Sequence, residues 1–189
     1  MIDYGQFQFS SPPRTATTWF MRAAFVAGFG VGQKAAVHTP PPTGGYSLMV
    51  SMARHPYDWL DSYYHEFKGG FCGVAEVDAL VLLVRKSTSF ERFLKLYVKY
   101  KTGFLGDLSR LYKADTVMRV EDLPWAAVEL FQSLDVPAKR LQEIAMTAPM
   151  NRRLVRYNDN GSHGPWRRAV CEAEADYCER FEYDHWRLR

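Results

Sequence analysis

The order of apolar and polar positions along the chain predicts strands that alternate with helices. An alternating stretch over Phe7 to Ser11 indicates a short strand, and the unbroken apolar run from Ser47 to Ala53 is typical of a strand covered on both faces. Further strands are expected at Ala35 to His38 and Thr116 to Val120. Helices are expected at Thr17 to Gly28, from Pro56 onward, and at Ser89 to Lys101, Trp125 to Leu134, Ala138 to Met146 and Arg167 to Phe181. The run Asp78 to Val84 stays open between helix and strand.

This alternation predicts an α/β fold in three layers, with a central parallel sheet flanked by helices on right-handed crossovers. The chain has 189 residues, which is most simply one domain over residues 1–189. Hydrophobic residues make up 47% and charged residues 24%, as in ordinary globular proteins. The formal charge of +3 is too weak to indicate a nucleic-acid partner, so none is expected.

Location and metal binding are addressed by what the sequence does not contain. No run approaches the roughly 20 apolar residues of a membrane span, and no signal-peptide pattern opens the chain. We therefore expect a cytoplasmic protein, or one whose anchor lies outside the sequence given. The three cysteines include no CxxC pair and the five histidines lack metal spacing, which argues against a zinc site and favours a reducing compartment.

The most informative segment runs from Arg54 to His65. Arg54 directly follows the predicted buried strand, Pro56 starts a helix, and Ser62 lies on that helix. An arginine fork and a hydroxyl at the end of a parallel strand can hold a phosphate. The alternative is an arginine at the sheet edge and a serine on a solvated helix face.

A second segment, Pro12 to Trp19, has the pattern of strand, tight loop and helix. Such a loop would direct backbone N–H groups, threonine hydroxyls and a helix N-terminus at an anion. It lacks the GxxxxGK[ST] pattern, which argues against a nucleotide kinase. The alternative is a capped helix start, because threonine is a good N-cap.

Together these segments resemble the sulfotransferases that use 3′-phosphoadenosine 5′-phosphosulfate (PAPS). Residues 13–19, Pro-Arg-Thr-Ala-Thr-Thr-Trp, are similar to the family's 5′-phosphosulfate loop, and Arg54 to His65 is similar to its 3′-phosphate motif, R-x-P-x-D-x-x-x-S-Y-Y-H. Val120 to Leu123 is similar to Y-E-D-L at a strand end, and Gly164 to Arg167 to G-x-W-[KR]. The resemblance covers nearly the whole chain and implies a P-loop-like sulfotransferase fold without a metal.

The resemblance implies roles for named residues. Arg14 would contact the bridging oxygen of the leaving group, Thr17 and Thr18 would donate to the 5′-phosphate, and Arg54 with Ser62 would hold the 3′-phosphate. The loop residues expected to contact the cofactor are Arg14, Thr15, Ala16, Thr17, Thr18 and Trp19. Trp19 would lie near the adenine or pack in the core. Ala16 replaces the family's usual glycine, and alanine tolerates positive φ poorly, so a reshaped loop is expected.

His38 is the candidate general base, because Val37-His38-Thr39-Pro40 resembles the T-H-x-P of cytosolic sulfotransferases. A histidine near its ordinary pKa of about 6.5 suits that task at neutral pH. A structural histidine at a strand end is the alternative, with an acidic residue such as Glu66 as the rival base.

The adenine end of the resemblance rests on fewer residues. Thr147 is similar to a family threonine near the adenine, whereas Val120 replaces a tyrosine. The late R-K-G loop for the 3′-phosphate is absent as written, and Arg156, Asn160 and Gly161 are the expected substitutes, with Arg152 or Arg153 as alternatives.

The sequence thus predicts a sulfotransferase that moves a sulfuryl group from PAPS to a hydroxyl or amine of a small-molecule or carbohydrate acceptor. Adenosine 3′,5′-diphosphate would be the other product. The competing interpretation is a non-catalytic protein that binds this diphosphate or serves as a scaffold.

Overall fold

The computed structural model describes residues 1–30, 38, 48–67, 75–147 and 164–183. The chain divides into two compact units. Unit 1 comprises residues 1–53 and 112–155, and unit 2 comprises residues 54–111 and 156–189. The predicted strand at Ala35 to His38 lies outside the described residues except for His38.

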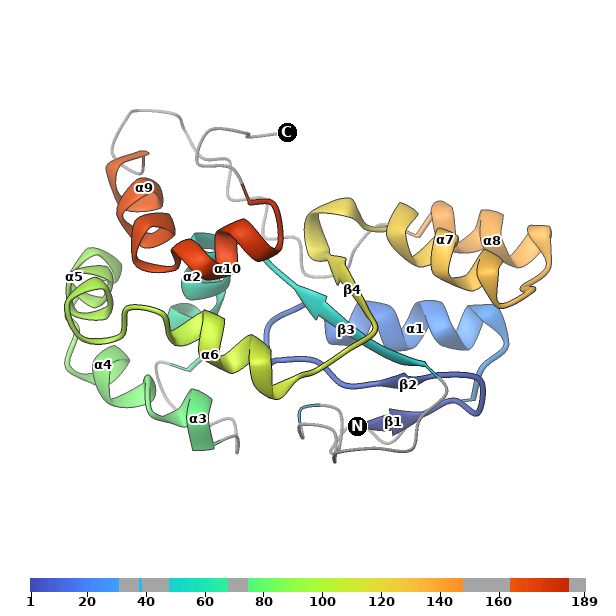
Figure 1. Ribbon diagram of the computed structural model, residues 1–189, viewed down its shortest axis with the longest axis horizontal. Helices are drawn as coiled ribbons and strands as arrows, with labels where there is room; N and C mark the ends of the chain where they lie inside the picture. Colours follow the sequence, from blue (N-terminus) through green and yellow to red (C-terminus); the bar gives the residue numbers. More distant parts are fainter. Residues whose placement is uncertain (31–37, 39–47, 68–74, 148–163, 184–189) are drawn as a thin grey trace. The chain divides into compact units, whose positions relative to one another are not determined.

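Unit 1 contains the sheet, whose four strands lie in the order β1-β2-β3-β4 (Figure 1). The strands are β1 (Ile2–Asp3), β2 (Gln8–Phe9), β3 (Met49–Ala53) and β4 (Thr116–Arg119). β3 pairs in parallel with both β2 and β4, with Val50 opposite Phe9 on one side and Thr116 on the other. Every residue of β3 is buried, as its unbroken apolar run predicts.

The prediction of an entirely parallel sheet is wrong at one edge, because β1 pairs antiparallel with β2. The chain reverses between them in a tight turn, in which Gly5 has a φ of 81° and the Tyr4 N–H donates to the Phe7 carbonyl (2.9 Å). A glycine adopts this left-handed conformation without steric cost. The sheet is therefore mixed, and the fold of the described residues is α/β.

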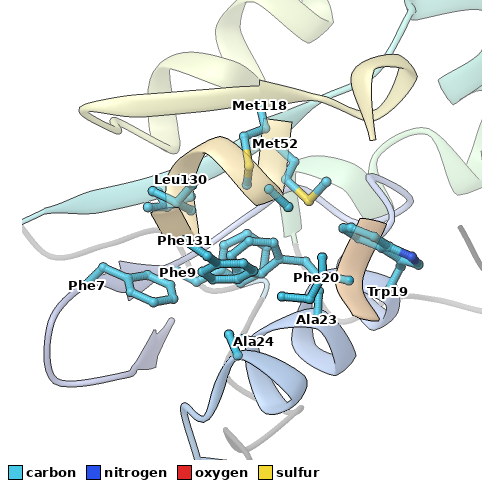
Figure 2. Packing of buried hydrophobic residues seen from close by; sticks show 14 of the residues in the cluster. Phe7, Phe9, Trp19, Phe20, Ala23, Ala24, Met52, Met118, Leu130 and Phe131 are labelled. Atoms are coloured by element: carbon cyan, nitrogen blue, oxygen red, sulfur yellow. The ribbon is translucent and has the colours of Figure 1, made fainter. Parts of the chain in front are cut away.

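Unit 1 contains the helices α1 (Thr17–Ala27), α7 (Trp125–Ser133) and α8 (Ala138–Ala145), which pack against one another, and α7 also contacts β4. All three were predicted within one or two residues. The core of unit 1 combines aromatic rings with aliphatic side chains (Figure 2). Phe20 of α1 stacks on Phe9 of β2 with ring centroids 4.2 Å apart and on Phe131 of α7 at 5.7 Å. Burial of these large rings stabilises unit 1.

Unit 2 is helical in the residues that the structure describes. It contains α2 (Pro56–Glu66), α3 (Ala75–Asp78), α4 (Val81–Arg85), α5 (Phe90–Tyr100), α6 (Phe104–Leu111), α9 (Gly164–Ala173) and α10 (Ala175–Arg180). Pro56 occupies the first turn of α2, and Ser89 caps α5 by accepting the Arg92 N–H (3.2 Å). The run from Asp78 to Val84, which the sequence left open, contains the end of α3, a turn and most of α4, so it is helical and not a strand.

Two features of unit 2 differ from the predictions. The last helix is broken at Glu174 into α9 and α10, and α6 was not predicted. Both involve Glu174, whose buried carboxylate reaches the start of α6. There it accepts the Leu105 N–H (2.9 Å), the Gly106 N–H (3.2 Å) and the Tyr97 hydroxyl (2.6 Å). A distant side chain thus caps the N-terminus of α6.

No helix among the described residues is long and apolar enough to cross a membrane.

The buried Glu174 predicts a pH dependence of stability. Burial raises the pKa of Glu174 from 4.5 to about 7, although the hydrogen bonds from Tyr97 and from the start of α6 lower it. The folded state therefore binds this proton more tightly than the unfolded state. The free energy of unfolding should fall by about 3 kcal/mol as pH rises from 4.5 to 7. Denaturant unfolding across this range checks the slope.

Glu174→Gln should remove most of this slope, whereas Glu179→Gln, at an exposed position of α10, should leave it in place. An unchanged slope in Glu174→Gln would show that the carboxyl group ionises normally.

Candidate functional site

The loop from β2 to α1 contains two residues in the left-handed backbone conformation, Arg14 and Ala16. Ser10 extends the β2–β3 pairing by donating its N–H to the Val50 carbonyl (3.1 Å). Pro12 and Pro13 follow, and α1 begins at Thr17. Arg14 has a φ of 70° and Ala16 a φ of 55°, both in the region that favours glycine. A reshaped loop was expected because alanine disfavours a positive φ. Ala16 nevertheless adopts the left-handed conformation.

Hydroxyl groups hold this loop from inside. The Thr15 hydroxyl donates to the Pro12 carbonyl (2.6 Å), so the Ser11 hydroxyl, which is hydrogen-bonded to Thr15 Oγ1, must be the donor in that pair. Both side chains are buried. The Thr15 hydroxyl is thus used within the loop, and a contact from Thr15 to a cofactor remains a prediction for its backbone.

The N-terminus of α1 is suited to an anion. Its cap residue, Ala16, makes no side-chain capping hydrogen bond, and its first turn contains no acidic residue. The Thr17 hydroxyl is buried and has no hydrogen-bond partner among the described residues, whereas Thr18 is exposed. The first N–H groups of a helix lack partners within the helix, and its dipole favours negative charge. These groups match those that a phosphate or sulfate requires.

Trp19 and Thr147, both predicted near the adenine, lie together in unit 1. The Trp19 Nε1–H donates to the Thr147 carbonyl (3.2 Å), and the Thr147 hydroxyl donates to the Glu143 carbonyl (2.8 Å). The Trp19 side chain is 1% exposed and belongs to the core cluster, as expected if this residue packs in the core. Contact between either residue and an adenine stays a prediction.

His38 lies beside the β2–α1 loop. Its Nδ1 is 2.8 Å from the Ser11 carbonyl oxygen. Because a carbonyl oxygen only accepts, Nδ1 carries the proton and the neutral ring accepts a proton at Nε2. The structure therefore brings the predicted base to the end of β2, in the tautomer that a base acting through Nε2 requires. The rival base, Glu66, is the exposed last residue of α2 in unit 2.

Arg54 and Ser62 belong to unit 2. The backbone of Arg54 is held on one edge by the Tyr177 hydroxyl of α10, which accepts its N–H (3.2 Å) and donates to its carbonyl (3.1 Å). Tyr177 thus supplies the pairing that a neighbouring strand would give. Ser62 lies on α2 and is 8% exposed. Tyr177 lies in no recognised motif, so the sequence analysis did not identify it.

The predicted fourth motif packs against the second within unit 2. Arg167 Nη2 is 2.6 Å from Asp58 Oδ1, and its guanidinium lies 5.1 Å from the centre of the Tyr57 ring. Both members of the ion pair are largely buried, and through this pair Asp58 links α2 to α9.

The third motif, Val120 to Leu123, follows directly after β4. Arg119 and Asp122 form an ion pair across this turn, with 2.5 Å between Nε and Oδ2. The residues expected to replace the late 3′-phosphate loop lie outside the described residues: Arg156, Asn160 and Gly161, and the alternatives Arg152 and Arg153.

Two further features of the described residues lie away from the predicted contacts. A cavity of about 630 Å³ in unit 2 is lined by side chains of α9, α10 and the residues that follow, including Cys171, Cys178 and Tyr183, and by none of the predicted site residues. Among the residues that the structure describes, no group of three or more His, Cys, Asp or Glu side chains is arranged to hold a metal ion.

Comparison with known proteins yields no matching family model, no matching curated protein and no matching solved structure.

The left-handed Ala16 predicts a stabilising substitution. An L-residue in this conformation costs about 1–2 kcal/mol, and glycine also loses about 0.4–1 kcal/mol more unfolded-state entropy. Ala16→Gly should therefore raise the free energy of unfolding by about 0.5–1 kcal/mol. Ala24→Gly, within the right-handed turns of α1, should lower it by about 1 kcal/mol or more. Denaturant unfolding of both variants measures the difference, and a destabilised Ala16→Gly would rule out the left-handed conformation at this position.

Proposed function

We propose that this chain transfers a sulfuryl group from PAPS to a hydroxyl or amine of a small-molecule or carbohydrate acceptor. The observation that carries the proposal is the β2–α1 loop of unit 1. Its sequence resembles the phosphosulfate loop of sulfotransferases. Its geometry, with an uncapped helix N-terminus and a buried Thr17 hydroxyl that has no partner among the described residues, suits a tetrahedral anion. The finer fold assignment, a P-loop-like sulfotransferase fold, is part of the same proposal.

The reaction is an in-line displacement at sulfur. The acceptor oxygen forms a bond to sulfur while the bond from sulfur to the bridging oxygen breaks, and adenosine 3′,5′-diphosphate leaves with the electron pair. Negative charge develops on the bridging oxygen, so an always-protonated guanidinium from Arg14 would stabilise the transition state more than the ground state. Positioning and electrostatics would supply most of the acceleration, as in phosphoryl transfer.

His38 would take the proton of a hydroxyl acceptor. The hydrogen bond from Nδ1 to the Ser11 carbonyl supports this role, because it leaves Nε2 as the basic nitrogen. Ser11 directly precedes the loop that would hold the phosphosulfate. The base would therefore lie next to the group that reacts.

The 3′-phosphate is assigned to Arg54 and Ser62. Support comes from within unit 2, where Tyr177 fixes the Arg54 backbone and Arg167 braces α2 through Asp58. Bracing of this kind reduces the entropy lost when a guanidinium side chain binds a phosphate. The cysteine pattern favours a reducing, cytoplasmic setting for this activity.

The first test of this proposal measures binding. PAPS and adenosine 3′,5′-diphosphate should both raise the melting temperature, and ATP and AMP should raise it far less because they lack a 3′-phosphate. Arg54→Ala should weaken diphosphate binding by roughly 1.5–3 kcal/mol, measured by calorimetry. Arg92→Ala, which removes the same charge from an exposed position of α5, is the matched control. Equal shifts from all four nucleotides would contradict the assignment of Arg54 and Ser62.

The second test separates binding from chemistry. His38→Ala should leave diphosphate affinity nearly unchanged but reduce sulfuryl transfer roughly 10²–10⁴-fold, as for loss of a general base. The wild-type rate should rise with pH through one histidine ionisation, and this limb of the pH profile should disappear in His38→Ala.

Arg14→Ala should lower turnover as well, whereas Arg22→Ala, at an exposed position of α1, should not. Turnover is followed by mass spectrometry with an acceptor library. Tight diphosphate binding without any turnover would favour the non-catalytic alternative.

A further inference from the structure

Tyr112 contacts the backbone of the candidate base, His38. It lies in unit 1 between α6 and β4, and its side chain is 2% exposed. Its hydroxyl donates to the backbone carbonyl of His38, with 2.6 Å between the oxygens. A buried hydroxyl–carbonyl bond of this length is a well-formed hydrogen bond.

His38 is therefore held at two points. Its imidazole Nδ1–H donates to the Ser11 carbonyl, and its own carbonyl accepts from Tyr112. A histidine side chain has only two rotatable bonds. Fixing both its backbone and one ring nitrogen therefore restricts the direction in which Nε2 points.

The Tyr112 segment is itself fastened to the sheet. Three residues later, the Asp115 carboxylate accepts the Met49 N–H (2.7 Å), and the Asp115 N–H donates to the Met49 carbonyl (2.9 Å). These bonds extend the pairing of β3 and β4 beyond the strands. The Tyr112 hydroxyl thus projects from a segment that the sheet holds in place.

We propose that Tyr112 is a positioning residue for His38, whose hydroxyl keeps the imidazole on the Ser11 carbonyl as the Nδ1–H tautomer. The catalytic consequence rests on the proposed function, but the positioning itself does not. Without the Tyr112 hydroxyl, the His38 backbone loses this hydrogen bond, and the imidazole exchanges between both tautomers and orientations.

The experiment reads the tautomer directly. Nitrogen-15 NMR of the whole chain at about pH 8.5, where imidazoles are neutral, separates protonated from unprotonated ring nitrogens. The His38 signals are assigned by their loss in His38→Ala. We expect wild-type His38 to be the Nδ1–H tautomer, and Tyr112→Phe to add a substantial Nε2–H population.

Tyr63→Phe is the matched control. The Tyr63 hydroxyl also donates to a backbone carbonyl from a buried position, that of Val77 at 2.7 Å, but it lies in unit 2. Its removal should lower the melting temperature to a similar extent as Tyr112→Phe and leave the His38 signals unchanged. A general loss of stability is thereby separated from an effect on His38.

Turnover supplies the second measurement. In Tyr112→Phe, kcat should fall roughly tenfold with little change in the KM for PAPS, because misplacement of a base affects the chemical step. Absence of turnover in the wild type would overturn the proposed function, and the NMR result would still decide the role of Tyr112. A wild-type His38 in the Nε2–H form, or unchanged His38 signals in Tyr112→Phe, would overturn the inference. Should Tyr112→Phe fail to fold, a single Nδ1–H tautomer of wild-type His38 would support the restraint, and a mixture of both tautomers would overturn it.

Discussion

The conformation of the β2–α1 loop is the constraint on which the candidate site of unit 1 depends. Two residues with side chains, Arg14 and Ala16, adopt left-handed backbone conformations where glycine would be at ease. These two conformations precede the start of α1 at Thr17, which has no side-chain cap. Ser11, at the beginning of the same loop, presents its carbonyl to His38.

The cost of this conformation is offset only in part within the loop. Each left-handed residue costs about 1–2 kcal/mol, and a buried hydroxyl without a partner costs about 1–3 kcal/mol. The Ser11–Thr15–Pro12 chain of hydrogen bonds returns about 1 kcal/mol per bond. An anion that bonded to the Thr17 hydroxyl and to the first N–H groups of α1 would offset more. This balance is typical of binding loops, which keep unfavourable conformations because a ligand stabilises them.

Elements whose signals are local were predictable from the sequence. The unbroken apolar run gave β3, Pro56 marked the start of α2, and Ser89 marked the start of α5. Elements that depend on distant residues were not predictable. α6 begins where Glu174 supplies its cap from 69 positions away, and the same carboxylate coincides with the break after α9. In the candidate site, the residues of recognised motifs were identified, but Tyr112 and Tyr177 were missed. The sequence alone does not distinguish a tyrosine that only fills the core from one whose hydroxyl holds another residue in place.

The proposed chemistry requires that a base and an anion-binding loop be kept in register, and unit 1 achieves this through main-chain carbonyls. The Ser11 carbonyl orients the His38 ring and the His38 carbonyl is itself held by Tyr112. A carbonyl acceptor, unlike a carboxylate, orients the imidazole and selects its tautomer without adding a negative charge beside the sulfuryl group. A carboxylate there would stabilise the imidazolium but would repel the anionic cofactor. The neutral restraint is thus the arrangement that suits a base working next to a polyanion.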